Sequence, residues 1–130
     1  MIDKKRIQDV VICKENDSIL EVSRILRDTK SRHLVVINNN KKPIGIISTV
    51  DINNRVVAQE LDYKKTNAGD VMTKNIDVVD IKDSFDKACE KMISKGTYSI
   101  PVVENGKLIG IIGFNELFCK VKEHEGVKKK

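Results

Sequence analysis

The sequence predicts an α/β fold of the α+β kind, in which two β-α-β-β-α repeats pack about a pseudo-twofold axis. Three observations lead to this prediction: an internal repeat, the same order of apolar patterns in both copies, and a length of 130 residues. A single copy of about 60 residues buries too little surface to be stable alone. We therefore expect the copies to pack face to face, so that the clefts between them draw on both.

The repeat is seen when the chain is compared with itself. The run "IGIISTVD" at residues 44–51 returns as "IGIIGFNE" at residues 109–116. An offset of 66 places Asp17 and Ser18 on Asp83 and Ser84. After the turns "NNNKK" and "ENGK", which differ in length by one residue, the offset becomes 65. A match that runs through both copies with one small gap indicates a duplicated unit.

The order of apolar patterns predicts the elements of each copy. A short strand comes first, at 10–13 and 76–81, and a helix with an apolar stripe follows it. Asp17 and Asp83 are predicted as the N-caps of these helices, and Gly96 as the glycine that ends the second one. The remaining elements are two strands around a turn (33–37 and 43–48; 99–103 and 108–113) and a closing helix (near 50–61 and 115–123).

Composition favours a cytoplasmic protein without membrane contact. Hydrophobic residues make up 40% of the chain and charged residues 33%, and no apolar run is long enough to span a bilayer. Cys13, Cys89 and Cys119 fall outside any zinc-ligand spacing, so we expect reduced structural thiols and no metal site. The net charge of +5 owes much to the two ends of the chain, which favours a solvated basic surface over a nucleic-acid patch.

Two runs carry a family resemblance. "RHLVVINNNKKPIGIISTVDI" at 32–52 and "YSIPVVENGKLIGIIGFNEL" at 98–117 resemble the tandem CBS domain, a pair often called a Bateman module. "DVMTKNIDVV" at 70–79 is similar to the way a repeat of this family usually begins. The resemblance divides the chain into a first repeat at 7–61, a linker at 62–70, a second repeat at 71–122 and a basic tail at 123–130.

This resemblance implies a regulatory module and not an enzyme. Many CBS pairs bind adenosine-containing ligands such as AMP, ADP, ATP or S-adenosylmethionine, and a homodimer of two pairs is implied as well. A ligand of this kind would bind in the cleft between the repeats and transmit its occupancy to a regulated protein partner. No obligatory cofactor is expected.

The resemblance also implies where a ligand would bind. The acid of the Gly-x-x-Ser/Thr-x-x-Asp pattern accepts both ribose hydroxyls, which suits an acceptor-only carboxylate, and Ser48 and Asp51 match that pattern. Ser48 and Thr49, at a predicted helix start, are candidates for the phosphate. Arg32 and His33, just before the middle strand, are further phosphate candidates. The candidates for the adenine cleft come from both copies: Ile12, Ile46, Val78, Thr97, Tyr98, Ser99 and Ile100.

A purely structural interpretation fits the same residues. Ser48 and Asp51 also form the pattern of a capping box, in which a serine and an acid three residues later satisfy the start of a helix. The second copy has Gly113, Asn115 and Glu116 at the matching positions, which keeps an acceptable helix start without the hydroxyl. The complete ribose and phosphate set is therefore present only in the first copy, and we predict that the cleft at Gly113, Asn115 and Glu116 is the weaker one.

Two other classes of function stay open from the sequence. A small basic nucleic-acid-binding protein would show a steep salt dependence, and a structural dimerisation module would bind no ligand in its clefts. The sequence contains no paired nucleophile and base, no metal cluster and no phosphate-binding glycine loop, so we do not expect an enzyme. The leading hypothesis is a regulatory module that senses an adenosine-containing ligand.

Overall fold

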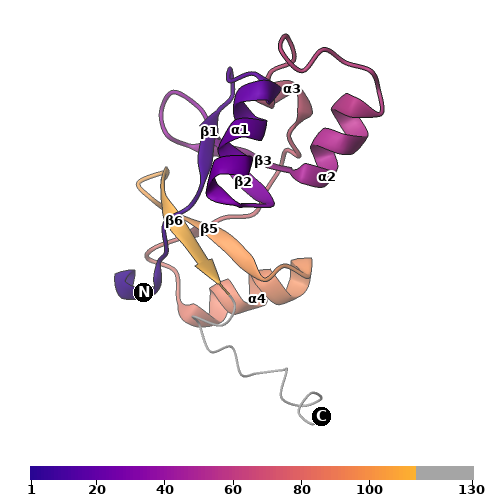
Figure 1. Cartoon of the computed structure of the whole chain (residues 1–130). Helices are drawn as coiled ribbons and strands as arrows, with labels where there is room; N and C mark the ends of the chain where they lie inside the picture. Colours follow the sequence, from indigo (N-terminus) through magenta and orange to yellow (C-terminus); the bar gives the residue numbers. More distant parts are fainter. Residues whose placement is uncertain (114–130) are drawn as a thin grey trace. The chain divides into compact units, whose positions relative to one another are not determined.

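The computed structural model describes residues 1–113, and its elements follow the predicted order (Figure 1). A short 3₁₀-helix that the sequence did not predict (Lys4–Arg6) comes first. It is followed by β1 (Ile12–Lys14), α1 (Ile19–Thr29), β2 (His33–Ile37), β3 (Pro43–Ser48) and α2 (Thr49–Ile52), which continues as a π-helix (Asn53–Val57). The chain then runs through α3 (Ala68–Val71), a short helix that was not predicted, and through β4 (Val79–Asp80), α4 (Phe85–Lys95), β5 (Ser99–Glu104) and β6 (Lys107–Gly113). The predicted mixed fold is confirmed, whereas the helix predicted near 115–123 lies outside the described residues.

Each repeat builds one three-stranded sheet with the same strand order. In the first sheet β1 runs parallel to β2, with Cys13 opposite Val36, and β2 runs antiparallel to β3. In the second sheet β4 runs parallel to β5, with Val79 opposite Val102. A parallel pair needs a crossover, which α1 and α4 provide. The pair Cys13 and Val36 and the pair Val79 and Val102 are related by the offset of 66 residues found in the sequence, so the duplication extends to the register of the strands.

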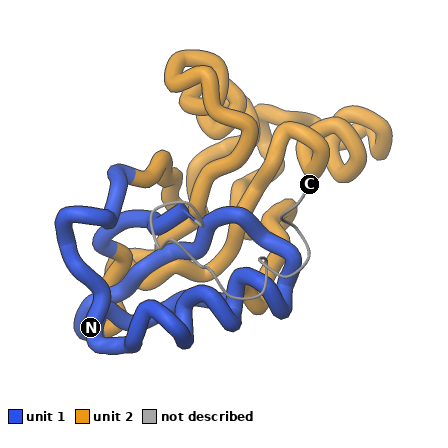
Figure 2. The backbone as a smooth tube through the Cα atoms, turned by 90° about the horizontal axis from the view of Figure 1, so that it is seen from below, with its two compact units in different colours: residues 1–9, 77–105, 109–130 blue, residues 10–76, 106–108 orange. Residues whose placement is uncertain are grey.

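The chain divides into two compact units, coloured separately in Figure 2. The β1–β3 unit contains residues 10–76 and 106–108, and the β4–β6 unit contains residues 1–9, 77–105 and the described residues from 109 onward. The core of the β1–β3 unit is formed by Cys13, Ile19, Val22, Leu26, Leu34, Val36, Ile47, Val56, Ala68 and Val71. The core of the β4–β6 unit is formed by Ile2, Val79, Ile81, Ala88, Cys89, Met92, Ile100, Val102 and Ile112.

The segment at the start of each repeat pairs with the third strand of the other repeat. In the β4–β6 unit, Gln8 and Ile111 exchange two backbone hydrogen bonds of 2.8 and 2.9 Å. In the β1–β3 unit, Thr73 and Ile46 exchange two of 2.8 and 3.0 Å. The N-terminal segment (residues 2–8) is also anchored by Ile2, which is 1% exposed in the core of the β4–β6 unit. The compact units are thus not the same stretches as the repeats predicted at 7–61 and 71–122.

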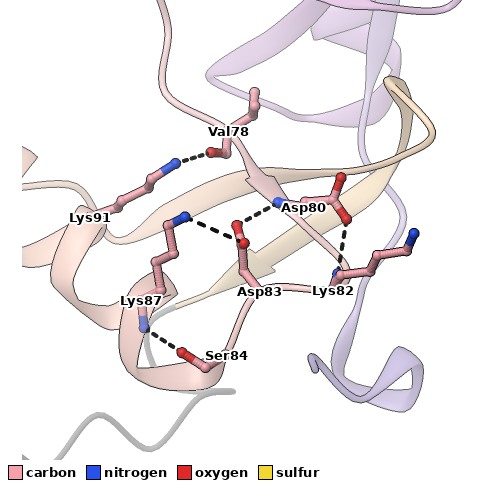
Figure 3. A network of polar contacts seen from close by, with 7 residues as sticks. All are labelled: Val78, Asp80, Lys82, Asp83, Ser84, Lys87 and Lys91. Atoms are coloured by element: carbon pink, nitrogen blue, oxygen red, sulfur yellow. Dashed lines mark hydrogen bonds and ion pairs between the residues drawn. The ribbon is translucent and has the colours of Figure 1, made fainter.

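The N-caps of the two long helices lie one residue later than predicted. Ser18 caps α1 and Ser84 caps α4, because each hydroxyl accepts a backbone N–H three residues ahead, at 3.2 and 3.1 Å. The neighbouring carboxylates of Asp17 and Asp83 turn the other way and each accept a backbone N–H three residues behind, at 2.9 Å. Figure 3 shows the bond to Asp83. The prediction of Asp17 and Asp83 as N-caps is therefore wrong, whereas Gly96 does end α4 in the left-handed conformation.

The cysteine expectations meet different outcomes. Cys13 is free and buried, and burial, followed by the nearby Asp17 carboxylate, raises the pKa of its thiol to about 12. Cys89 is disulfide-bonded, so the expectation of reduced thiols throughout is wrong at that position. Among the helices of residues 1–113, none combines the length and the apolar character needed to cross a bilayer.

Candidate functional site

The candidate site is centred on the turn from β3 into α2, where the predicted capping box is present. Ser48 is extended, with φ −114° and ψ 166°, and Thr49 begins the helix. The Ser48 hydroxyl accepts the Asp51 N–H at 3.1 Å, and the Asp51 Oδ2 accepts the Ser48 N–H at 2.9 Å. The reciprocal bonds fix the Asp51 carboxylate against the backbone, as the structural interpretation of the sequence predicts.

The Asp51 carboxylate keeps acceptor capacity beyond the cap. Its Oδ1 lies 3.6 Å from Nη2 of Arg55, and the side chain is 17% exposed. A carboxylate offers about four lone-pair positions. The hydrogen bond from Ser48 and the pairing with Arg55 occupy two of them, so about two remain free to accept further hydrogen bonds. Asp51 is thus partly buried, held in a single orientation and able to accept hydrogen bonds from two hydroxyl groups.

The backbone brings the predicted phosphate residues to the same turn. His33 lies opposite Ser48 in the register of β2 and β3, and the Thr49 N–H donates to the Arg32 carbonyl at 2.9 Å. The Arg32 and His33 residues are exposed. Because the N–H groups of Thr49 and Asp51 already have partners within the chain, an anion at this turn would depend on side chains more than on the helix start.

The apolar candidates of the first repeat share one row of the sheet. Ile12 on β1 and Ile46 on β3 both lie opposite Val35 on β2. Ile12 is 41% exposed, although it lies in a strand. Val35 is buried, but it does not belong to the core that contains Val36, the next residue of β2. Because successive residues of a strand point to opposite faces of the sheet, the row of Ile12, Val35 and Ile46 lies on the face away from that core.

The candidates of the second repeat lie in the β4–β6 unit. Val78 precedes β4, and its carbonyl accepts a hydrogen bond of 2.7 Å from the Lys91 ammonium (Figure 3). Tyr98, in the connection between α4 and β5, is 84% exposed, and Thr97 beside it is exposed as well. Ser99 begins β5, whereas Ile100 is 3% exposed and belongs to the core of its unit.

The weaker predicted site is described only in part. Gly113 is the last residue of β6, and Asn115 and Glu116 lie outside the described residues. Within residues 1–113, no group of three or more histidine, cysteine, aspartate or glutamate side chains is arranged to hold a metal ion.

Sequence reasoning missed Arg55. Its Nη1 donates to the Val71 carbonyl at 2.6 Å while Nη2 faces Asp51. The spacing of four residues between Asp51 and Arg55 is the usual spacing of a helical ion pair, and it was a signal for the contact with Asp51. The bond to Val71, sixteen residues away along the chain, has no such local signal.

A comparison with protein families gives two matches. The model described as "CBS domain" matches residues 5–58 and again residues 68–123. A homoserine O-acetyltransferase of Methanosalsum zhilinae is 32% identical over 117 residues, which covers 89% of this chain and 23% of that protein. An uncharacterised protein of Methanopyrus kandleri is 29% identical over 111 residues, which covers 85% of this chain and 57% of that protein. The chain thus spans between about a quarter and somewhat more than half of these relatives.

Among solved structures, a CBS domain protein of Pyrobaculum aerophilum complexed with AMP is similar along almost the whole chain. It is 27% identical, the match covers 89% of each chain, and the TM-score is 0.71. The architecture of the two sheets and their crossover helices is therefore shared with an experimentally determined structure.

Proposed function

The chain belongs to the CBS domain family, with two copies in tandem, and from that premise we propose that it is a regulatory module whose ligand is an adenosine-containing small molecule. The ligand is bound at the Ser48–Asp51 turn, and its occupancy is transmitted to a protein partner. AMP, ADP, ATP and S-adenosylmethionine all carry the ribose that this turn would recognise, so the class is proposed and not one member.

The observation that carries the proposal is the state of the Asp51 carboxylate. A capping box alone needs one oxygen of an acid at this position, and it functions on a fully exposed helix. Here the Asp51 side chain is only 17% exposed and its carboxylate is also held near Arg55. An acceptor that is fixed in orientation and still has free lone pairs is well suited to the two vicinal hydroxyls of a ribose.

The neighbouring side chains extend the proposal toward the rest of a nucleotide. We assign the phosphate to the Thr49 hydroxyl together with Arg32 and His33, which the backbone brings to the same turn. We assign an apolar contact with the base to the row of Ile12 and Ile46. The contributions of Val78, Thr97, Tyr98, Ser99 and Ile100, and a weaker second site at Gly113, Asn115 and Glu116, stay predictions.

The comparisons support a binding function. The similar structure from Pyrobaculum aerophilum was determined with AMP. The homoserine O-acetyltransferase matches this chain over only 23% of its length, so the similarity does not assign acetyl transfer to this chain. We propose that this chain supplies regulation and not catalysis, and that it acts as a homodimer in which ligand binding shifts the population of poses that a partner recognises.

Calorimetric titration tests the proposal, with Asp51→Asn as the decisive variant. An asparagine keeps an oxygen for the Ser48 N–H, so the cap is preserved while the charge and one acceptor are lost. We expect AMP affinity to fall by about tenfold or more, since a hydrogen bond to a charged group contributes about 1.5–3 kcal/mol. Glu21→Gln is the matched control, because it removes a carboxylate from an exposed ion pair with Arg24 in the same unit.

Removing a hydroxyl from the ligand gives a second, independent test of the site. The 2′-deoxy form of AMP should bind wild-type protein more weakly, and it should lose little further affinity in Asp51→Asn because the shared hydrogen bond is already gone. Equal affinity of wild type and Asp51→Asn for every adenosine compound that binds would overturn the site. A steep loss of oligonucleotide binding with added salt, in a protein that binds no adenosine compound, would instead favour the nucleic-acid alternative.

A further inference from the structure

Arg55 joins the candidate ligand site to a segment that lies outside it. Its guanidinium donates a 2.6 Å hydrogen bond to the Val71 carbonyl from Nη1, and Nη2 lies 3.6 Å from Asp51 Oδ1. A guanidinium is planar and has five N–H donors in a fixed fork, so it can hold two acceptors at once in a defined relation. One side chain thereby sets the position of Asp51 relative to Val71.

The helix geometry places Arg55 in this position. After Ile52 the helix widens into the π-helix Asn53–Val57, and the Ala58 N–H donates to the Asn53 carbonyl at 2.8 Å, five residues back. Short π segments are uncommon in proteins, but those that do occur often lie at functional sites. Val56 is completely buried in the core, which anchors this turn while its neighbour Arg55 remains 46% exposed at the side chain.

Val71 belongs to a segment with its own fixed contacts. We call residues 68–73 the connecting segment; it contains α3 and continues to Thr73, which exchanges two hydrogen bonds with Ile46 on β3. Val71 is 2% exposed, so its carbonyl is held beside the core. The connecting segment is also the start of the second repeat in the sequence.

We propose that Arg55 is a positioning residue: it orients the Asp51 carboxylate for the hydroxyls of the ligand and couples occupancy of that carboxylate to the order of the connecting segment. This inference rests on the function proposed above. The capping box already fixes the Asp51 carboxylate through Oδ2, and Arg55 faces Oδ1. When ligand hydroxyls bind this carboxylate, they restrict the Arg55 guanidinium beside it, and the bond from Arg55 to Val71 becomes more persistent. Coupling between two sites is reciprocal, so a firm connecting segment also favours ligand binding.

Hydrogen exchange measured by NMR or mass spectrometry, with and without AMP, tests this coupling in the full chain. In the wild type, AMP should slow exchange at Met72 and Thr73, whose amides donate to the Ala68 and Ile46 carbonyls. In Arg55→Gln, this protection should disappear and AMP affinity should fall by about fivefold or more, the low end of typical coupling. Arg24→Gln is the matched control, because Arg24 lies 3.7 Å from Glu21 in an exposed ion pair on α1.

A conservative variant separates positioning from charge. In Arg55→Lys the ammonium can still pair with Asp51, but a point charge on a flexible stem does not hold two acceptors in a fixed fork. We expect it to recover most of the affinity that Arg55→Gln loses and little of the AMP-dependent protection. Full protection at Met72 and Thr73 in Arg55→Gln, with an affinity equal to that of Arg24→Gln, overturns the proposal.

A ligand-free experiment keeps this inference separate from the proposed function. Without any ligand, Arg55→Gln and Asp51→Asn should each speed exchange at Met72 and Thr73, and the double variant should be no faster than the faster single variant. That pattern supports the Arg55 coupling even if no adenosine compound binds, in which case the proposed ligand alone is wrong. Independent effects that multiply in the double variant show that Arg55 and Asp51 act separately, and they overturn the coupling.

Discussion

The two glycines of the repeated "IGII" runs meet the same packing problem with different neighbours. Gly45 on β3 lies against the connecting segment, where a Cβ would be 2.7 Å from the Met72 Cγ and 2.9 Å from the Thr73 carbonyl oxygen. Gly110 on β6 lies against the N-terminal segment, where a Cβ would be 2.5 Å from the Gln8 carbonyl oxygen. In both units the incoming backbone leaves no room for a side chain, so the shared glycine follows from strand pairing and requires no ligand.

The comparison also shows which neighbour can yield. Gly45 is crowded by the Met72 side chain, which is unbranched and adopts other rotamers easily, and less closely by the Thr73 carbonyl oxygen, at 2.9 Å. Gly110 is crowded by a backbone carbonyl and by the β-branched side chain of Ile7, both of which are held by the pairing of Gln8 with Ile111. Replacement of the shared glycine is therefore expected to destabilise the two units by different amounts.

The largest expected effect is that of Gly110→Ala. We expect it to lower the free energy of unfolding by about 3 kcal/mol, and Gly45→Ala by about 1 kcal/mol, because the backbone oxygen comes closer at Gly110 and because the φ of Gly110, +158°, is one that L-residues rarely adopt. Urea unfolding followed by circular dichroism measures both. Gly96→Ala is a control for conformation alone, since Gly96 has φ +67° with nothing near its missing Cβ. A Gly45→Ala cost equal to that of Gly110→Ala would contradict this account.

The turns before α1 and α4 provide a second comparison: their backbone hydrogen bonds are equivalent, but the charged side chains around them differ. Asp17 and Asp83 accept equivalent backbone N–H groups. Four residues beyond Asp83, the Lys87 ammonium lies 3.5 Å from its Oδ1 (Figure 3). Glu21 occupies the matching position after Asp17. The Asp80 N–H, followed by the nearby lysines, holds the pKa of the Asp83 carboxyl below its ordinary value of 3.8.

A smaller, pH-dependent effect follows for Lys87→Gln. Because the folded-state pKa of Asp83 is lowered, its stabilising contribution is present above pH 3.8 and is lost as the pH falls through the folded value. Lys87→Gln should therefore cost about 0.3–0.5 kcal/mol at neutral pH and nothing measurable once Asp83 is protonated in the fold. Unfolding free energies of wild type and variant across this range check it. Lys82→Gln removes the same charge from a residue whose backbone, and not its side chain, contacts Asp80; an equal loss there would show a general charge effect.

Much of this organisation could be predicted from the sequence because it depends on local periodicity. The strands, the long helices α1 and α4 and the Ser48–Asp51 capping box follow from patterns only a few residues long. The N-caps were misassigned because Asp17 and Ser18 are both good capping residues, and only the geometry shows which one faces the helix. The pairing of each starting segment with the other repeat, and the bond from Arg55 to Val71, depend on contacts distant in the chain that leave no local pattern.

The smallest expected effect concerns Cys13, whose counterpart in the second repeat is Val79. Both residues are buried, at 3% and 0% exposure, and both lie opposite a valine of the neighbouring strand. Cys13→Val should change the free energy of unfolding by no more than about 0.5 kcal/mol, because the swap is apolar and close in volume. Since the pKa of the Cys13 thiol is raised to about 12, native protein should also resist alkylation at this residue until urea unfolds it. Two outcomes would contradict this expectation: rapid alkylation of Cys13 in native protein, and a loss of about 2 kcal/mol in Cys13→Val that is absent in the reciprocal variant Val79→Cys. Either would show that the first repeat depends on this thiol in a way that the second does not.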